Sequence, residues 1–450
     1  MYRLYSVLLF VYFVARLPSV LYASFRAREA ARSVGERFGR LPERVNPHRQ
    51  PSIWVHAVSV GEALSARPLL SGLRASYPDH RLLLSTTTAT GREVAQRFGK
   101  HLVDAVFYAP FDFMPFVTAS LDRISPQLLI IIDTEIWPNL FRACRLRGSK
   151  IVMVNGRLSN RSFRGYRMVK IFMRRVVRNF DRVCVQTNLW KERFVSLGVH
   201  GSRIAVTGSL KFDVADAAKD DTRFEFNDSV LTYFHVPDGR QVVVAASTLK
   251  GEEEPVVCAF SRIRKDSIDS LLVLAPRHKE RFAEAEQIAL HSGFSVARRT
   301  ALPVGGDPMA DVVILDTLGE LPGLYQLASV VFVGGSLVPA GGHNILEPAV
   351  FSKAIVFGPY MENFAEIARK FLAEGAAVQV RNASELEDSL VDLVANKERC
   401  DVMGAAARQV LDANRGATQR TLAVIREVFP PFTAPLPLPT PRRASVNENA

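Results

Sequence analysis

From Ser52 onward, short apolar runs alternate with amphipathic stretches along the chain. The apolar runs are "IWVHAV", "RLLLSTTT", "LLIIID", "KIVMVN" and "RVCVQT", which are rich in β-branched residues and separated by segments of helical spacing. This order is typical of a parallel sheet wrapped by helices, because strands buried on both faces read as nearly continuous apolar runs. The pattern predicts a doubly wound α/β domain in the first half of the chain.

A second series of the same kind begins after the middle of the chain, with "QVVVAAS", "SLLVLAP", "VVILD", "VVFVGG" and "AIVFG". A chain of 450 residues is also too long for one ordinary core. We therefore predict two Rossmann-like domains, over residues 25–215 and 241–428. The polar residues 216–240 between them are predicted to be a linker region. The tail 429–450 is rich in proline and polar residues, which predicts disorder.

The N-terminal segment departs from this globular pattern. It reads "YSVLLFVYFVARLPSVLYASF", is interrupted only by Arg16 and Pro18, and is followed by a cluster of arginines. A bilayer core takes about 20 apolar residues as a helix, so the segment could span one only if Arg16 is tolerated. We expect residues 1–24 to be a membrane anchor, spanning or interfacial, with the arginines keeping the next domain on the cytoplasmic side. The alternative is a helix packed on the same chain.

Charge and composition narrow the classes of function. The net charge is +12, which favours acidic partners such as nucleic acid, anionic lipid or a phosphorylated substrate. No recognised nucleic-acid-binding motif accompanies the charge, so we expect no nucleic-acid partner. The four cysteines form no CxxC pair, which indicates neither a zinc site nor a disulfide framework. No G-x-G-x-x-G string opens the first βα unit, which disfavours an NAD-dependent enzyme.

Polar residues gather directly after several predicted strands, where open α/β sheets bind their ligands. They are Ser59, Gly61 and Glu62; Asp133, Thr134, Glu135 and Trp137; Arg277 and His278; and the string "SLVPAGGHNILEP". Gly341 and Gly342 allow a ligand to approach the backbone closely, and a helix start after them would offer N–H groups to an anion. We expect these residues to line a cleft between the two domains.

Each of these residues also has a purely structural interpretation. Glu62 could cap the helix that it begins, since a helix N-terminus attracts a carboxylate. Asp133 and Glu135 could cap the next helix, or raise one another's pKa if both face one cavity. His56 fits a core histidine, and the loop from Pro276 to His278 could simply be solvated. The basic stretch "RGYRMVKIFMRRVVRNFDR" favours an anionic membrane surface or is merely a solvated face.

A set of strings in order resembles a known family. "HAVSVGE", "IIDTEIWPNL", "VNGRLSNRSFRGY", "VTGSLKFD", "LAPRHKERF", "LDTLGEL", "FVGGSLVPAGGHNILEP" and "FGPYMENF" resemble the Kdo transferases of Gram-negative bacteria. These enzymes move 3-deoxy-D-manno-octulosonic acid (Kdo) from CMP-Kdo to a lipid A precursor. The resemblance extends from the N-terminal segment to about residue 425. It implies a GT-B fold, a CMP-Kdo donor, the precursor lipid IVA as acceptor, and the cytoplasmic side of the cell inner membrane.

The resemblance also implies roles for single residues. Glu62 matches the general base, Lys211 a group that stabilises the transition state, and Asp133 an acidic group where relatives often carry glutamate. The positions that match CMP-Kdo-binding residues are Pro276, Arg277, Leu318, Gly319, Glu320, Asn344, Ile345, Leu346 and Glu347. Glu135, His278, Gly341 and Gly342 are additional candidates. The chain departs from its relatives in "STLKGEE", where "STHEGEE" is usual, and at Tyr360, where histidine is common.

The chemistry of such a transfer suits these residues. An acceptor hydroxyl must lose its proton as it attacks the anomeric carbon, and a carboxylate such as Glu62 can accept it. Arg277, Lys211 and backbone amides near Asn344 could stabilise the departing phosphate, so we expect no metal cofactor. A single displacement would invert the anomeric configuration. A GT-B transferase that uses a UDP-sugar remains the alternative, because it would share the fold and the glycine-rich loop.

Overall fold

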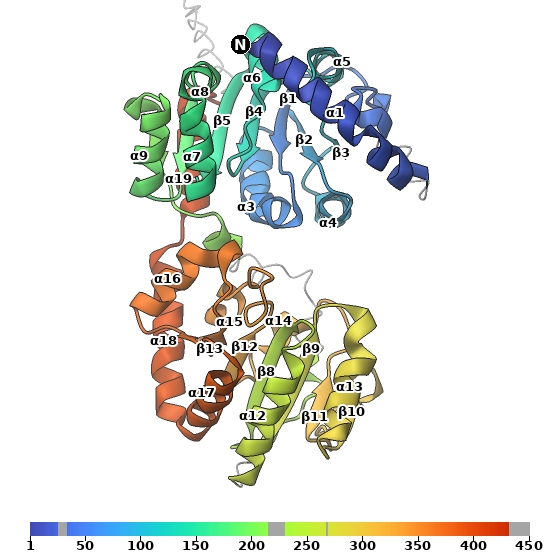
Figure 1. The fold of residues 1–450 in the computed structure, drawn as a ribbon, viewed down its shortest axis with the longest axis vertical. Helices are drawn as coiled ribbons and strands as arrows, with labels where there is room; N and C mark the ends of the chain where they lie inside the picture. The colour runs from blue at the N-terminus through green and yellow to red at the C-terminus, as the bar shows by residue number, and fades with distance from the viewer. Residues whose placement is uncertain (26–33, 215–229, 267–268, 432–450) are drawn as a thin grey trace, which may run out of the picture. The chain divides into compact units, whose positions relative to one another are not determined.

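The computed structural model describes residues 1–25, 34–214, 230–266 and 269–431. The chain divides into two compact units, one of Met1–Leu210 with Gly416–Ala450 and the other of Lys211–Arg415. Each unit contains a seven-stranded sheet whose strands all run parallel (Figure 1). The predicted α/β class is confirmed, with two Rossmann-like units of the GT-B type.

The first sheet has the strand order β3-β2-β1-β4-β5-β6-β7. Its strands are β1 (Ser52–His56), β2 (Arg81–Thr86), β3 (Ala105–Tyr108), β4 (Pro126–Ile132), β5 (Lys150–Gly156), β6 (Arg182–Val185) and β7 (Ile204–Val206). The helices of this unit are α1 (Tyr2–Phe25), α3 (Val60–Ser76), α4 (Ala89–Gly99), α5 (Met114–Ile124), α6 (Pro138–Leu146), α7 (Asn160–Met168), α8 (Lys170–Val177), α9 (Asn188–Leu197) and α19 (Ala417–Val428), with 3₁₀ turns η1 (Glu43–Val45) and η2 (Gly201–Arg203).

The apolar run of β4 shows why a doubly wound sheet forms. Leu129 and Ile131 join one hydrophobic core, whereas Leu128 and Ile130 join the core on the opposite face. Successive side chains of a strand point to opposite faces, so an unbroken apolar run supplies both helix layers at once.

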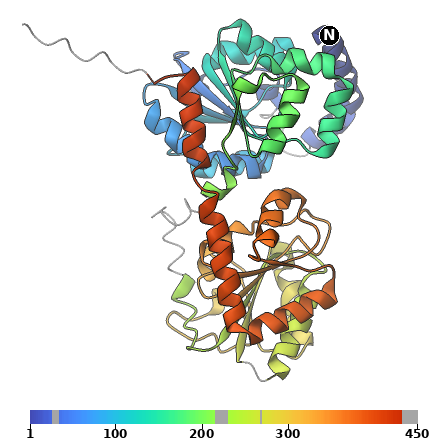
Figure 2. The same ribbon diagram turned by 90° about the vertical axis from the view of Figure 1, so that its left-hand side faces the viewer.

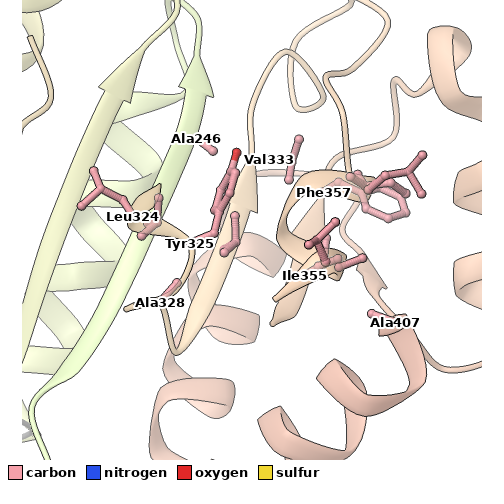
Figure 3. Close-up of a cluster of buried hydrophobic side chains, with 14 of the residues drawn as sticks. Ala246, Leu324, Tyr325, Ala328, Val333, Ile355, Phe357 and Ala407 are labelled. Carbon is pink, nitrogen blue, oxygen red and sulfur yellow. The ribbon is translucent and has the colours of Figure 1, made fainter. Parts of the chain in front are cut away.

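The second sheet has the strand order β10-β11-β9-β8-β12-β13-β14. Its strands are β8 (Gln241–Thr248), β9 (Ser270–Pro276), β10 (Val296–Arg298), β11 (Val312–Ile314), β12 (Val330–Val333), β13 (Ala354–Phe357) and β14 (Val378–Gln379). The helices are α12 (Glu253–Lys265), α13 (Phe282–His291), α14 (Leu321–Leu324), α15 (Leu346–Val350), α16 (Ala365–Ala373), α17 (Ala383–Ala395) and α18 (Lys397–Ala413), with 3₁₀ turns η3 (Lys279–Arg281), η4 (Arg299–Ala301) and η5 (Glu362–Phe364). Figure 3 shows part of its core, where Tyr325 stands among Leu324, Ala246 and Val333.

The domain boundaries differ from the predicted ones at the C-terminal end. The sequence predicts that the second domain runs to residue 428, but the chain returns to the first unit at Gly416. Leu422 and Ile425 of α19 are buried in the first unit's core, and α19 lies beside that unit's sheet (Figure 2). A Cβ on Gly72 of α3 would lie 2.3 Å from Leu422 Cδ1, so this glycine is what lets the helix approach closely. Interface packing of this kind leaves no signal in the local sequence pattern.

The predicted linker and tail fall largely on residues 215–229 and 432–450, which lie outside the described residues. The last part of the predicted linker belongs instead to the second unit, because Val230 and Phe234 are buried in its core.

The N-terminal segment forms α1, one side of which contacts the rest of the first unit. The Phe13 ring meets the rings of Phe38 and Phe111 edge-on, and the Tyr5 hydroxyl donates to Asp112 Oδ2 at 2.9 Å. Among the helices of the described ranges, none combines the length and the apolar character needed to cross a membrane.

Candidate active site

Glu62 lies in the first turn of α3, at the carboxyl edge of the first sheet. Ser59 is the N-cap of this helix, and its hydroxyl donates to Glu62 Oε1 at 3.0 Å. The backbone amide of Val58 donates to Glu62 Oε2 at 2.7 Å. The Ser59 hydroxyl also accepts from the Glu62 amide at 3.4 Å, so Ser59 is the residue that caps α3. Among the described residues, the Glu62 side chain bonds only to the two residues before the helix, and these bonds fix where its carboxylate stands.

The electrostatic surroundings of Glu62 go beyond those of an ordinary cap. Burial and the nearby charges of Asp133 and Glu135 raise the pKa of Glu62 to about 7, although the hydrogen bonds from Val58 and Ser59 oppose the shift. A carboxyl group with a pKa near neutrality is matched to accepting a proton at physiological pH. The structure thus brings together the three acidic residues that the sequence singles out.

Asp133 follows β4 in the left-handed region, with φ of 59°. Its carboxylate is held by the side-chain amide of Asn155 and by Arg157 Nε, the latter at 3.2 Å. Asn155, the last residue but one of β5, also has a positive φ, of 61°, so the backbone is constrained both after β4 and at the end of β5. Asp133 is therefore an anchored, charge-compensated group, and its effect on Glu62 is electrostatic.

Glu135 accepts a hydrogen bond from Trp137 Nε1 at 3.2 Å. Burial, opposed by that bond and reinforced by Asp133, raises the pKa of Glu135. Neither acid caps the next helix: the amides of Asn139 and Leu140 at the start of α6 donate to Asp112 instead. The capping interpretation of Asp133 and Glu135 is wrong.

Buried His56 supports this cluster from within β1. Trp54 Nε1 donates to Ser85 Oγ at 2.7 Å, which leaves the Ser85 proton to donate to His56 Nδ1 at 2.8 Å. Burial lowers the pKa of His56 to about 4, so the ring is neutral. The ring packs edge-on against Trp137 with centroids 4.9 Å apart. His56 is a core histidine, as the sequence suggests, and it orients the indole that contacts Glu135.

In the second unit, Pro276 ends β9 and Arg277 and His278 follow it in an exposed loop. The backbone amide of Arg277 donates to Thr248 O at 3.0 Å. Within the described ranges Arg277 forms no ion pair, whereas nearby Arg281 pairs with buried Glu253 at 2.9 Å. The two arginines of "PRHKERF" therefore differ in role, because Arg281 fixes the loop and Arg277 offers its charge to solvent or a ligand.

The glycine-rich string after β12 lies close to these cations. Gly341 and Gly342 have φ values of 88° and 76°, and a Cβ on either would clash with Asn363 or Met361. Burial, together with the neighbouring basic side chains of Arg277 and His278, lowers the pKa of His343 to about 4. Among the described residues, His343 Nε2 is a buried polar atom with no hydrogen-bond partner. A ligand bound beside Arg277 could supply that partner.

The next residues of this string carry the predicted donor contacts. Asn344 donates to Glu347 Oε1 at 3.0 Å and accepts from the amide of Leu346 at 3.2 Å. Ile345 and Leu346 are buried. The Tyr325 hydroxyl bonds to Glu347, and burial raises the pKa of Glu347 against the opposing effects of Asn344, Arg277 and Tyr325. The predicted helix start is the short α15, of 5 residues.

Three further candidate donor-binding residues of the second unit lie in the segment after β11. Leu318 and Gly319 lie after β11, where Gly319 has φ of 89° and the Leu318 side chain is exposed. Glu320 is buried and bound by Arg299 at 2.8 Å and by the Thr317 hydroxyl at 2.6 Å.

Lys211 belongs to the same unit. Its Nζ donates to Asn363 O at 2.9 Å and lies 4.3 Å from the centre of the Phe364 ring. Within the ranges that the structure describes, no group of His, Cys, Asp and Glu side chains is arranged to hold a metal ion.

Comparisons with known proteins decide the family. A 3-deoxy-D-manno-octulosonic acid transferase of Haemophilus influenzae is 32% identical, over 87% of this chain and 90% of its own length. A transferase of the same name from Bordetella pertussis is 34% identical, over 87% of this chain and 90% of its own length.

The chain belongs to the Kdo transferase family.

A family model described as 3-deoxy-D-manno-octulosonic-acid transferase matches residues 32–214. Kdo transferases are glycosyltransferases of lipopolysaccharide biosynthesis, so the enzyme class inferred from the sequence strings is confirmed. A UDP-GlcNAc 2-epimerase structure from Neisseria meningitidis covers 84% of this chain and all (100%) of its own, with TM-score 0.58 and 12% identity, and shows a shared fold alone.

Several side chains that contact the candidate residues could not be singled out from the sequence. Asn155 and Arg157 stand in the quoted string "VNGRLSN", yet only the fold brings them to Asp133. His343 stands within "GGHNILEP", and its position beside two glycines was the available signal. Glu252 and Tyr325 are internal groups whose partners are distant in sequence.

Proposed function

We propose that the protein transfers Kdo from CMP-Kdo to a lipid A precursor, lipid IVA, with inversion, and that Glu62 is the general base. The observation that carries this proposal is the Glu62 carboxyl group, whose pKa is raised to about 7 by burial and by Asp133 and Glu135. Burial alone can raise the pKa of a capping carboxyl, as it does for Asp112 to about 7, but Glu62 is only half-buried, stands at the edge of the sheet and has two acidic neighbours, which suits a general base.

The reaction assigns a role to each group. The acceptor hydroxyl attacks the anomeric carbon of Kdo while its proton passes to Glu62. The new C–O bond forms as the bond from the anomeric carbon to the CMP phosphate oxygen breaks, and CMP leaves with that electron pair. Arg277 and Lys211 stabilise the growing phosphate charge as fixed cations. Attack on the face opposite the leaving group inverts the configuration.

Mass spectrometry of the products tests the donor and the acceptor together. Purified enzyme is incubated with CMP-Kdo and a tetraacylated lipid A precursor, and in parallel with UDP-sugars. We expect products heavier by one or more Kdo units from CMP-Kdo and no product from UDP-sugars. Transfer from a UDP-sugar alone would contradict the proposal.

We also propose that the enzyme works at the cytoplasmic face of the inner membrane, with α1 lying along an anionic lipid surface. The face of α1 that points away from the rest of the first unit exposes Leu4, Leu8 and Val11, at 62%, 62% and 60%. The ring of Phe172 in α8 lies 5.5 Å from that of Tyr2, so α8 and its exposed Ile171 adjoin α1. Basic residues of the α7–α8 segment would meet anionic headgroups: Arg167, Lys170, Arg174 and Arg178.

Sedimentation with vesicles containing anionic lipid tests this surface. The double variant Leu8→Asp/Val11→Asp should lose most vesicle binding, because two charges would enter the acyl boundary. Val402→Asp, at an exposed valine of α18, is the matched control and should bind normally. Equal binding of both variants would contradict the assignment.

A further inference from the structure

Glu252 is a buried carboxylate that bonds to a loop far from it in sequence. Its Oε2 accepts from the backbone amides of Leu249 at 2.8 Å and Gly335 at 2.7 Å. Its Oε1 accepts from the amides of Ser336 at 3.0 Å and Leu337 at 2.9 Å. Glu252 is the residue before α12, yet its side chain makes no capping bond to that helix. Its hydrogen bonds are directed to the turn after β8 and the loop after β12.

The surrounding backbone is shaped to admit this carboxylate. A Cβ on Gly334 would lie 2.9 Å from Glu252 Oε2 and 2.6 Å from Ser247 O. A Cβ on Gly335, which has φ of 64°, would lie 2.8 Å from the ring of His343. The two glycines therefore let the loop pass between the carboxylate on one side and His343 on the other.

The same loop leads on to the candidate donor-binding groups. The amide of Gly342 donates to Gly335 O at 2.8 Å, which ties the string holding His343 and Asn344 to the loop that Glu252 anchors. On the other side, Thr248 O accepts from the amide of Arg277 at 3.0 Å. The turn that contains Glu252 thus connects the loops of Arg277 and Asn344.

We propose that Glu252 is a positioning residue for the nucleotide-sugar donor: its carboxylate sets the loop Gly334–Leu337 and, through it, the groups that bind the CMP portion. This inference rests on the proposed function. Glu252 acts through the backbone and takes no part in bond making, so its loss should weaken donor binding and spare the chemical step. It also gives a physical role to the last part of the "STLKGEE" string.

Replacing Glu252 by glutamine keeps the size of the side chain but removes its charge and one of its two acceptor oxygens. A carboxylate offers two acceptor oxygens, whereas an amide offers one acceptor and an NH₂ group that would face two backbone N–H donors. The Glu252→Gln side chain therefore fills the same space, but its NH₂ group repels two of the four backbone amides that the carboxylate binds. Glu254→Gln is the matched control, because Glu254 lies two residues further on, in the first turn of α12, and is exposed.

The test measures CMP binding by calorimetry and steady-state kinetics with CMP-Kdo, well below the melting temperature of each protein. We expect Glu252→Gln to raise the Kd of CMP and the KM of CMP-Kdo by about tenfold or more and to change kcat less than about threefold, since only binding is affected. Glu254→Gln should match the wild type. A Glu252→Gln protein with wild-type Kd and KM would overturn the inference.

The outcomes separate the two proposals. A wild-type protein that binds no CMP would overturn both the donor assignment and this inference, whereas normal wild-type binding with an unaffected variant overturns the inference alone. If Glu252→Gln fails to fold, hydrogen exchange on the wild type decides. The amides of Gly335, Ser336 and Leu337 should be strongly protected although they lie in a loop, and exchange at the rate of an open chain would contradict the anchor.

Discussion

Acidic residues stand at the carboxyl edges of both sheets, but in one unit the acid has acidic neighbours and in the other it is paired with an arginine. In the first unit, Glu62 is half-buried near Asp133 and Glu135, and its pKa rises to about 7. In the second unit, Glu253 is neutralised by Arg281, and the exposed charge after β9 is that of Arg277. Two sheets of one architecture thus present a cluster of acids in one unit and an exposed cation in the other.

The difference shows that position at a strand end predicts a functional region without predicting a role. A carboxylate with enough donors serves to hold backbone in place, as Glu252 does. Burial raises the pKa of both Glu252 and Glu62, but for Glu62 the acidic neighbours Asp133 and Glu135 add to the shift. The partners and charges around each acid, available only from the fold, distinguish the two.

The largest effect is expected from separating the two roles of Glu62. Glu62→Gln keeps the shape of the side chain but cannot accept a proton, so turnover should fall about 10²–10⁴-fold. Ser59→Ala is the matched control, because it removes the capping partner and keeps the carboxylate. The Ser59→Ala change should cost about 0.5–2 kcal/mol of stability, seen as a lower Tm, with turnover changed only a few-fold.

Turnover and melting of both variants are measured on the same samples. If Ser59→Ala loses as much turnover as Glu62→Gln, the cap rather than the proton acceptor is what matters.

The next effect contrasts the two arginines of "PRHKERF". Arg277→Ala should raise the KM of CMP-Kdo about 10–100-fold with little change in Tm, because a charged hydrogen bond to the donor is lost. Arg281→Ala should instead lower Tm, since removing one partner of a buried ion pair costs about 3–5 kcal/mol. Donor kinetics and melting curves distinguish them. A low Tm for Arg277→Ala would show that this side chain is structural.

The smallest effect concerns metal. Because Arg277 and Lys211 supply the positive charge at the leaving group in our proposal, excess EDTA should change turnover less than about twofold. The assay uses purified enzyme and substrates, with added Mg²⁺ as the control. Complete loss in EDTA with recovery on adding Mg²⁺ would contradict this assignment.

Most of the fold follows from local pattern. Runs such as "LLIIID" predict buried parallel strands because every side chain of β4 from Leu128 onward enters one of two cores. The return of α19 to the first unit was missed, since its contact with Gly72 joins distant parts of the chain. The amphipathic pattern of α19 indicates that one face of this helix is buried, but it does not indicate against which unit that face packs.

The positions of the candidate site residues can be predicted from the sequence. Glu62, Asp133 and Glu135 follow predicted strands, and parallel strands bring such residues to one edge. Their partners were not predictable. Arg157 compensates Asp133, Asp112 takes over the capping of α6, and Glu320 is bound by Arg299. Each of these pairs depends on the geometry of loops, which the secondary-structure preferences of the residues do not predict.

The most direct test of the central claim is the pH dependence of kcat/KM, which reports the pKa of an essential base in the free enzyme. Because Glu62 must be ionised to accept the proton, kcat/KM should fall as the pH drops below a midpoint near pH 7, and Glu135→Gln should move that midpoint down by removing a like charge. An acid limb near the ordinary carboxyl value of 4.5, unmoved by Glu135→Gln, would contradict the assignment of Glu62 as a base tuned by its acidic neighbours.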